Sequence, residues 1–432
     1  MRQAGKGLLA PLCVALGLSA ASGAAAQSAH GCRNLISHEA LRAVEGTDGG
    51  FFRLIPDLQS HHALSDVSIA RIADLSKAMA ARGTTLVLLP VPTRAQVMAH
   101  TLPAAARDVG YDADISATVH QEMIRRLGVA GVAVADVRQR LRQAALAGEE
   151  VFFAADPRPT PQGARIMAQV VADVLGGLSQ TAGLPRGGFT TEAMGKTTLP
   201  SPTRAQLQLA CHGALPPVTA EVTQTTGDAQ AAGAAIAAVI GTEIAGTPEL
   251  NLAGYISEFS GLRAGSYGVT GGGAYAAMSS FLTSRNFEDS TPAVVIWEFP
   301  VSAPFGQQGD QPMRELIAAA SGSCTMPLGL RPGADGMKLT ADLSAVPSER
   351  PVTLAFDTGG AVAQQVLFHF EGADGQRRTR GIWRHPDQVL TGRFFVPLSG
   401  LQTAGLRAVE VELPLEHGPH PRLSVCLQGG DQ

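Results

Sequence analysis

The chain has 432 residues, of which 45% are hydrophobic and 16% charged, with a formal net charge of −4. This length accommodates one large domain and a smaller one. The charge balance excludes the strongly basic proteins that bind nucleic acid and the highly charged chains that stay disordered. We therefore expect a folded protein with no nucleic-acid partner.

The amino terminus has the organisation of an export signal. Arg2 and Lys6 precede an apolar segment at 8–18, and three alanines follow at 24–26. A basic region, a short apolar core and a small-residue cleavage site predict a secretory signal peptide over residues 1–26. The apolar core is too short to span a bilayer, and no other apolar stretch is long enough. We expect an exported protein without a membrane span.

Removal of this segment with Cys13 leaves four cysteines, Cys32, Cys211, Cys324 and Cys426. An even number in an oxidising compartment indicates two disulfides, with three possible pairings. A bond between Cys324 and Cys426 would close the carboxy-terminal segment and leave Cys32 with Cys211, and this is the pairing we predict. The rival interpretation is a metal site, but the cysteines lack paired CxxC spacing, so we expect no metal.

Apolar patterns of helix and strand alternate through the first part of the chain. Helices are predicted at 65–82, 115–127, 137–146 and 162–175, and strands at 84–89, 129–137 and just before the loop at 154–161. Strands and helices in alternation favour an α/β fold with a doubly wound parallel sheet. Residues 176–230 form a connection rich in Gly, Thr and Pro. It is too long for a structureless loop in a compact domain, and a Cys32–Cys211 disulfide would hold it.

A buried strand at 234–240 then ends in Gly241-Thr242-Glu243. Open α/β sheets place ligands at the carboxyl ends of their strands, so we expect the side chain after this turn to face a cleft. In esterase-like enzymes of this layout that residue is a serine nucleophile. Here it is Glu243.

The later elements complete this domain and begin another. We predict a helix at 252–262, a further helix opening at Gly271–Gly273, and a buried strand at 293–300. From residue 337 only short strands separated by turn residues follow, which predicts a carboxy-terminal β-sandwich. The predicted domains are therefore 27–330 and 331–432.

Several short motifs occur in an order that resembles one family. They are Glu45-Gly46 to Phe52-Arg53, Pro92-Thr93-Arg94, Thr160 to Arg165, Gly241-Thr242, Asn251 to Tyr255, Glu258 to Gly261, Gly271 to Gly273, and Trp297-Glu298-Phe299. The resemblance is to the AlgX/AlgJ-like SGNH-hydrolase proteins, periplasmic factors for O-acetylation of exopolysaccharides, above all alginate. It implies a periplasmic location, a sandwich like a carbohydrate-binding module, and no cofactor. The implied partners are an acidic or neutral exopolysaccharide and other proteins of polymer synthesis or acetylation.

This sequence departs from the family at the catalytic positions. The family has an Asp-x-His pair and a serine after Gly-Thr, whereas here Asp156 remains, Arg158 replaces the histidine and Glu243 replaces the serine. Serine acyl transfer needs a hydroxyl and a base that titrates near neutrality, and arginine stays protonated. We predict that Asp156, Arg158 and Glu243 converge, with an Arg158–Glu243 ion pair that is structural or forms a polar floor for sugar hydroxyls.

The resemblance also marks candidate substrate-binding residues, namely Arg94, Gly272 and Trp383. Trp383 is flanked by Arg384 and His385, which suits stacking on an acidic glycan, although a core position is equally compatible. The main prediction is a catalytically degenerate protein that binds or organises an exopolysaccharide during its synthesis and acetylation. The alternative is an active polysaccharide O-acetyltransferase with unorthodox catalytic residues.

Overall fold

The computed structural model describes residues 28–228, 233–306, 309–322, 324–334, 336–347, 352–401 and 405–427. The predicted signal peptide at 1–26 lies outside these residues. The first domain is built on a five-stranded sheet in the order β4-β3-β9-β7-β8, whose neighbouring strands are all parallel. Its strands are β3 (Thr85–Val91), β4 (Ala133–Val134), β7 (Ala237–Gly241), β8 (Ala264–Gly268) and β9 (Val294–Pro300). The predicted α/β class is confirmed.

Both faces of this sheet are covered by helices, which explains the unbroken apolar runs in its strands. Leu86 and Leu88 pack into one hydrophobic cluster, whereas Val87 and Leu89 pack into another. The first cluster lies under α1 (Asp66–Ala80), α4 (Ala113–Val129), α10 (Ala276–Thr283) and α12 (Gln311–Ser321). The second lies under α5 (Arg138–Leu146), α6 (Pro161–Gly177) and α9 (Leu252–Ser260).

Local sequence signals set the helix ends. The side chain of Ser65 caps α1 by accepting a hydrogen bond from the Ser68 amide, and the side chain of Thr160 caps α6 from the Gly163 amide. Pro161 follows that cap at the first helical position, where its missing N–H costs nothing. Gly83 has a φ of +80°, a left-handed conformation that favours glycine and ends the turn after α1.

Several predicted elements differ from the structure. The strand expected just before the loop at 154–161 is only an isolated bridge between Phe152 and Pro159. The strand expected at 129–137 is only Ala133–Val134, because α4 continues to Val129. The connection at 176–230 contains a β-hairpin, β5 (Phe189–Thr198) with β6 (Thr219–Gly227), and a helix, α7 (Pro202–Gln208). Edge strand β8 was not predicted, since its sequence Ala-Gly-Ser-Tyr-Gly lacks the apolar β-branched residues typical of strands.

The second domain is a sandwich of two antiparallel sheets with a shared apolar core. One sheet has the order β10-β18-β13-β16, with β10 (Met326–Leu328), β18 (Arg422–Leu427), β13 (Val352–Asp357) and β16 (Arg393–Pro397). The other has the order β11-β12-β17-β14-β15, with β11 (Arg331–Pro332), β12 (Lys338–Asp342), β17 (Leu406–Glu412), β14 (Gln365–Gly372) and β15 (Arg377–Trp383). Because β10 pairs with β18, the sandwich begins a few residues before the predicted boundary at 331.

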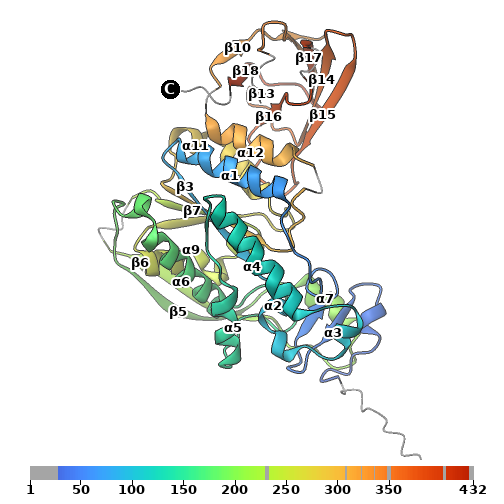
Figure 1. Cartoon of the computed structure of the whole chain (residues 1–432), viewed down its shortest axis with the longest axis vertical. Helices are drawn as coiled ribbons and strands as arrows, with labels where there is room; N and C mark the ends of the chain where they lie inside the picture. Colours follow the sequence, from blue (N-terminus) through green and yellow to red (C-terminus); the bar gives the residue numbers. More distant parts are fainter. Residues whose placement is uncertain are drawn as a thin grey trace, which may run out of the picture.

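The remaining short elements are β1 (Ala43–Glu45), β2 (Phe51–Arg53), α2 (Arg94–Val97), α3 (Ala105–Asp108), α8 (Glu243–Gly246) and α11 (Arg285–Asp289). Figure 1 shows the sandwich stacked above α1, α11 and α12, on the side of the sheet away from α5 and α6. Both predicted disulfides, Cys32–Cys211 and Cys324–Cys426, are present. In the described parts of the chain, no helix has the length and apolar character of a membrane span.

Candidate functional site

The turn after β7 is held by a buried carboxylate. The backbone amide of Thr242 donates to Glu298 Oε2 over 2.7 Å, and its hydroxyl lies 3.0 Å from Oε1 and 2.9 Å from Oε2. Gly241 is required here, because a Cβ on it would lie 2.2 Å from Glu298 Oε2. These contacts place Glu243 at the start of α8, half-buried at the carboxyl edge of the sheet.

Glu298 is 0% exposed. Burial raises the pKa of Glu298 to about 7, against the hydrogen bonds from Thr242 that lower it, and the charge of Glu243 raises it further. This carboxyl group therefore gains or loses a proton near neutral pH. The motif containing Glu298 was recognised in the sequence, but no role was predicted for it.

Arg158 is bound locally by Asp156. Its Nε and Nη2 atoms lie 2.8 and 2.9 Å from the two Asp156 oxygens, and its backbone amide donates to Asp156 Oδ1 over 2.9 Å. Nη2 also donates to the carbonyl of Pro200 over 2.8 Å. The guanidinium is thus fixed by a bidentate pair and a backbone oxygen. Such pairing gives a rigid and strong interaction.

The predicted Arg158–Glu243 ion pair is wrong. Both residues are described, and the charged atoms of Arg158 pair with Asp156 and with no other carboxylate within 4.0 Å. The reason is local geometry, since an Asp two residues before an Arg closes a short turn with little loss of chain entropy. Asp156 therefore occupies the guanidinium of Arg158, and Glu243, which is far away in the sequence, forms no ion pair with it.

Arg53 is the cation near Glu243. Its guanidinium binds Asp57 through two hydrogen bonds of 2.9 Å. Burial lowers the pKa of Arg53, but the charges of Asp57, Glu243 and Asp156 outweigh it and the pKa is raised overall. Glu243 and Asp156 thus both act on one guanidinium. The sequence motif Phe52-Arg53 pointed to this position without assigning it a role.

This arrangement lacks the parts of a serine acyltransfer site. Among the described residues, no hydrogen bond or ion pair joins a histidine to Glu243. Arg158 holds Asp156, the carboxylate that would orient a base. A nucleophile and a base in contact are the signature of covalent acyl transfer, and the residues at the positions predicted from the sequence motifs are Glu243 and Arg158.

Arg94 is not available to a polymer. It is 3% exposed, donates to the carbonyl of Phe153 and to Asp48, both over 2.8 Å, and lies over the ring of Phe52. The backbone of Gly50 packs directly against the Arg94 guanidinium, since a Cβ on Gly50 would clash with Arg94 Nη2. The prediction that Arg94 contacts substrate is therefore wrong, and its role is to hold loops together.

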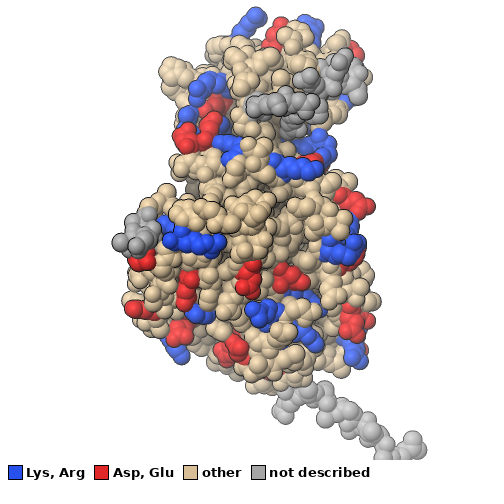
Figure 2. Space-filling model, turned by 60° about the vertical axis from the view of Figure 1, so that its left-hand side comes forward, with Lys and Arg blue, Asp and Glu red and all other residues tan. Residues whose placement is uncertain are grey.

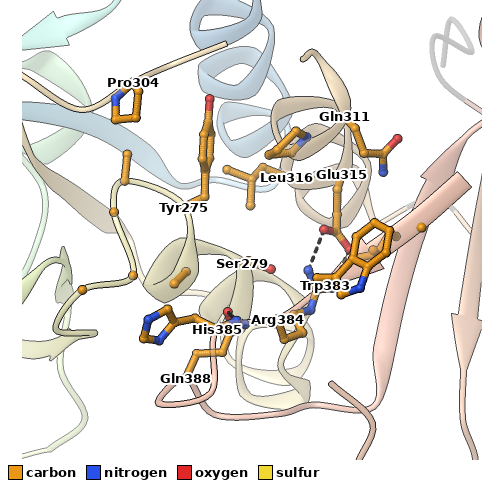
Figure 3. Close-up of a pocket in the computed structure, with 18 residues that line it drawn as sticks. Tyr275, Ser279, Pro304, Gln311, Glu315, Leu316, Trp383, Arg384, His385 and Gln388 are labelled. Carbon is orange, nitrogen blue, oxygen red and sulfur yellow. Dashed lines mark hydrogen bonds and ion pairs between the residues drawn. The ribbon is translucent and has the colours of Figure 1, made fainter. Parts of the chain in front are cut away.

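Gly272 and Trp383 come together in a pocket of about 660 Å³ between the two domains (Figure 3). The loop at Gly271–Gly273 follows β8, and Trp383 ends β15 of the sandwich. Trp383 is 65% exposed, so it is not a core residue, whereas Trp297 is 0% exposed as predicted. The indole of Trp383 lies over Gly381, where a Cβ would be 2.2 Å from its Cη2 atom.

An ion pair fixes the walls of this interdomain pocket. Arg384 Nη1 lies 2.7 Å from Glu315 Oε2, and the two side chains are 6% and 4% exposed. Glu315 also accepts from the backbone amide of Phe395 over 3.1 Å, which ties α12 to β16. Figure 3 shows this pair beside Trp383. These contacts link α12 to the sandwich at the wall of the pocket.

Among the described residues one group could hold a metal ion. His369, Glu410 and Glu412, on the sandwich, place their donor atoms within 4.8 Å of one another. The ammonium of Lys338 lies 3.2 Å from Glu410 and 3.6 Å from Glu412, and so supplies positive charge to the same carboxylates. With an ammonium already beside them, the two carboxylates have less to gain from a metal ion.

Comparison with known proteins identifies relatives of the first domain. The family described as "SGNH hydrolase-like domain, acetyltransferase AlgX" matches residues 43–301. "Alginate biosynthesis protein AlgX" of Pseudomonas putida is 27% identical over 273 residues, covering 59% of this chain and 55% of the relative. "Probable alginate O-acetylase AlgJ" of Pseudomonas fluorescens is 28% identical over 245 residues, covering 54% and 60%. The chain thus spans 55% to 60% of the length of these relatives.

Solved structures show the same fold. Pseudomonas aeruginosa AlgX superposes with a TM-score of 0.78 at 21% identity, covering 90% of this chain and 95% of that one. The O-acetyltransferase domain of Pseudomonas putida AlgJ superposes with a TM-score of 0.50 at 24% identity, covering 60% and 91%. The first superposition includes the sandwich as well as the sheet domain, because it covers nearly the whole chain.

Proposed function

Because the chain belongs to the family of AlgX-type SGNH hydrolase-like domains of alginate biosynthesis and O-acetylation, we propose that it binds an exopolysaccharide without transferring acetyl groups. The observation that carries this proposal is the interdomain pocket, which joins the loop at Gly271–Gly273 to the exposed indole of Trp383. Exposed aromatic rings beside polar groups are typical platforms for sugars. The protein would present a polymer to other proteins of synthesis or acetylation, and the sandwich would act as its carbohydrate-binding module.

The residues at the strand ends support the absence of acetyl transfer. By the resemblance of its sequence motifs, Glu243 takes the place of the family's serine, and Arg158 is held by Asp156 and Pro200. Arginine keeps its proton at physiological pH and cannot act as a base. The two disulfides and the predicted signal peptide favour the periplasm as the location, because disulfides persist in oxidising compartments.

One observation favours the alternative, an active O-acetyltransferase. The pKa of Glu298 is about 7, which suits a group that exchanges protons at working pH. However, Glu298 is 0% exposed and both of its oxygens are bonded to Thr242. An acyl group at the surface cannot reach it, so the binding function is the better supported of the two.

Tryptophan fluorescence tests the binding function directly. The chain has two tryptophans, and Trp383 is the exposed one, so a change in emission on adding an oligosaccharide that is lost in Trp383→Ala reports on Trp383. We expect saturable changes with soluble oligosaccharides and their loss in Trp383→Ala. Calorimetric binding that is unchanged in Trp383→Ala would place the polymer elsewhere and overturn the proposal.

A further inference from the structure

The interdomain pocket has few charges, and they are already neutralised. Of its lining residues, only Glu315, Arg384 and His385 are residues that can carry charge near neutral pH. Burial raises the pKa of the Tyr275 phenol, which also lines the pocket, to about 12, so it stays neutral. Whether an acidic or a neutral glycan fits therefore depends on these three side chains.

The charge of Arg384 is already paired with that of Glu315. It forms the buried pair with Glu315, donates through Nη2 to the carbonyl of Arg393 over 3.1 Å, and lies over the ring of Phe394. Glu315 in turn accepts from Phe395. A pair bonded on both sides contributes almost no net field to the pocket, and separating it would leave a buried charge uncompensated.

His385 is held in a turn at the edge of the pocket. Its Nδ1 atom accepts a hydrogen bond from the backbone amide of Asp387 over 3.3 Å. In this arrangement Nδ1 is occupied within the turn. Its backbone amide donates to Gln388 Oε1 over 2.8 Å, which fixes the turn that holds it.

The pocket instead offers neutral hydrogen-bonding groups. The amide of Gln311 and the hydroxyl of Ser279 are buried, and in the described part of the chain neither has a hydrogen-bond partner. Ser279 is 6% exposed, on α10, and Gln311 begins α12 (Figure 3). Buried polar groups without partners cost free energy that a ligand hydroxyl can recover. With the flat face of Trp383 nearby, they match a sugar ring with hydroxyls and no charge.

Outside the pocket lining, burial and the charges of Arg314 and Arg378 lower the pKa of Arg380, whose guanidinium is bonded to the carbonyls of Pro397 and Ser399. On the face drawn in Figure 2, basic and acidic side chains are interspersed. On the outer face of the sandwich sheet β11-β12-β17-β14-β15, Arg377 pairs with Glu371 and Lys338 pairs with Glu410. A polyuronate has one carboxylate on every sugar, and each one brought into the pocket would lose water without gaining a cation.

We propose that the interdomain pocket binds an uncharged polysaccharide in preference to a polyuronate. The proposal rests on the proposed binding function and names its substrate class. The neutral pair of Glu315 and Arg384 sets the walls, Trp383 provides the stacking face, and Gln311 and Ser279 provide hydrogen bonds.

Two polymers that differ only in charge test this directly. Oligomers of β-1,4-mannuronate and the same oligomers after reduction of their carboxyl groups are titrated into the full chain, with a neutral β-1,4-glucan oligomer as a third probe. Trp383 emission and calorimetry are both followed. We expect the reduced oligomer to bind at least about tenfold more tightly than the uronate, with an affinity that does not depend on ionic strength.

Matched variants locate the binding. Gln311→Ala should weaken the neutral oligomer severalfold, whereas Gln162→Ala, at the start of α6 and outside the pocket, should leave it unchanged. Ser279→Ala removes a hydroxyl that has no hydrogen-bond partner among the described residues, so it should fold normally and still bind the neutral oligomer less tightly. Equal or tighter binding of the uronate would overturn the charge preference and leave the proposed function standing. Failure of all three probes to bind would overturn both.

Discussion

Replacing Glu298 with glutamine should remove a specific pH dependence of stability. The folded protein holds this carboxyl at a pKa of about 7, against an ordinary value of 4.5. Because the folded state binds the proton more tightly than the unfolded state, its contribution is full below the ordinary pKa and is lost as pH rises through 7. A shift of this size corresponds to about 3 kcal/mol, most of it lost between pH 5 and pH 8.

Urea denaturation from pH 5 to pH 8 measures this loss. Glutamine has the shape of the acid and can still accept from the Thr242 amide, so Glu298→Gln should fold and show a flatter pH profile than the unmodified protein. Glu243→Gln should flatten the profile in part, because the charge of Glu243 contributes to the raised pKa of Glu298. Glu150→Gln, at an exposed carboxylate, is the control and should leave the profile unchanged. Identical profiles for Glu298→Gln and the unmodified protein would refute the reasoning.

Three further predictions concern stability and activity. Arg384→Met should cost about 3–5 kcal/mol in urea denaturation, because it leaves Glu315 buried and unpaired, and a second change, Glu315→Leu, should recover much of the loss; equal stability of Arg384→Met and the unmodified protein would contradict this. The double change Cys324→Ser and Cys426→Ser should lower the free energy of unfolding by about 2–5 kcal/mol. In the unmodified protein, non-reducing peptide mapping should find Cys324 joined to Cys426 and not to Cys211. Neither Glu243→Ser nor Arg158→His alone should hydrolyse a chromogenic acetyl ester, since only the double change combines a hydroxyl with a base oriented by Asp156; turnover by either single variant would count against it.

The fold was predictable because its signals are local and periodic. Apolar strands such as β3 and β9, and capped amphipathic helices such as α1 and α6, were all recognisable in the sequence. The hairpin of β5 and β6 was not predicted, because its strands have few apolar residues and are largely exposed. Its stability comes from pairing with itself and packing on α9, which no local pattern encodes.

The site was predictable in position but not in its contacts. The sequence placed Glu243 correctly after the end of a strand, whereas Asp156 follows only an isolated bridge at Phe152, and both lie near Arg53. It could not show that Arg158 would turn to Asp156, because that choice depends on the loop conformation and on the carbonyl of Pro200. It also could not show that Arg94 is buried. Nor could it show that Gly272 and Trp383 line one pocket, because that depends on how the two domains pack.

Intact-mass spectrometry after incubation with a chromogenic acetyl ester tests the central claim most directly. If the site is degenerate, the unmodified protein should gain no acetyl mass, and the ester should be hydrolysed no faster than in buffer alone. An acetyl adduct with turnover, both abolished in Glu243→Gln, would contradict the account, because Glu243 would then be the group that carries the acetyl.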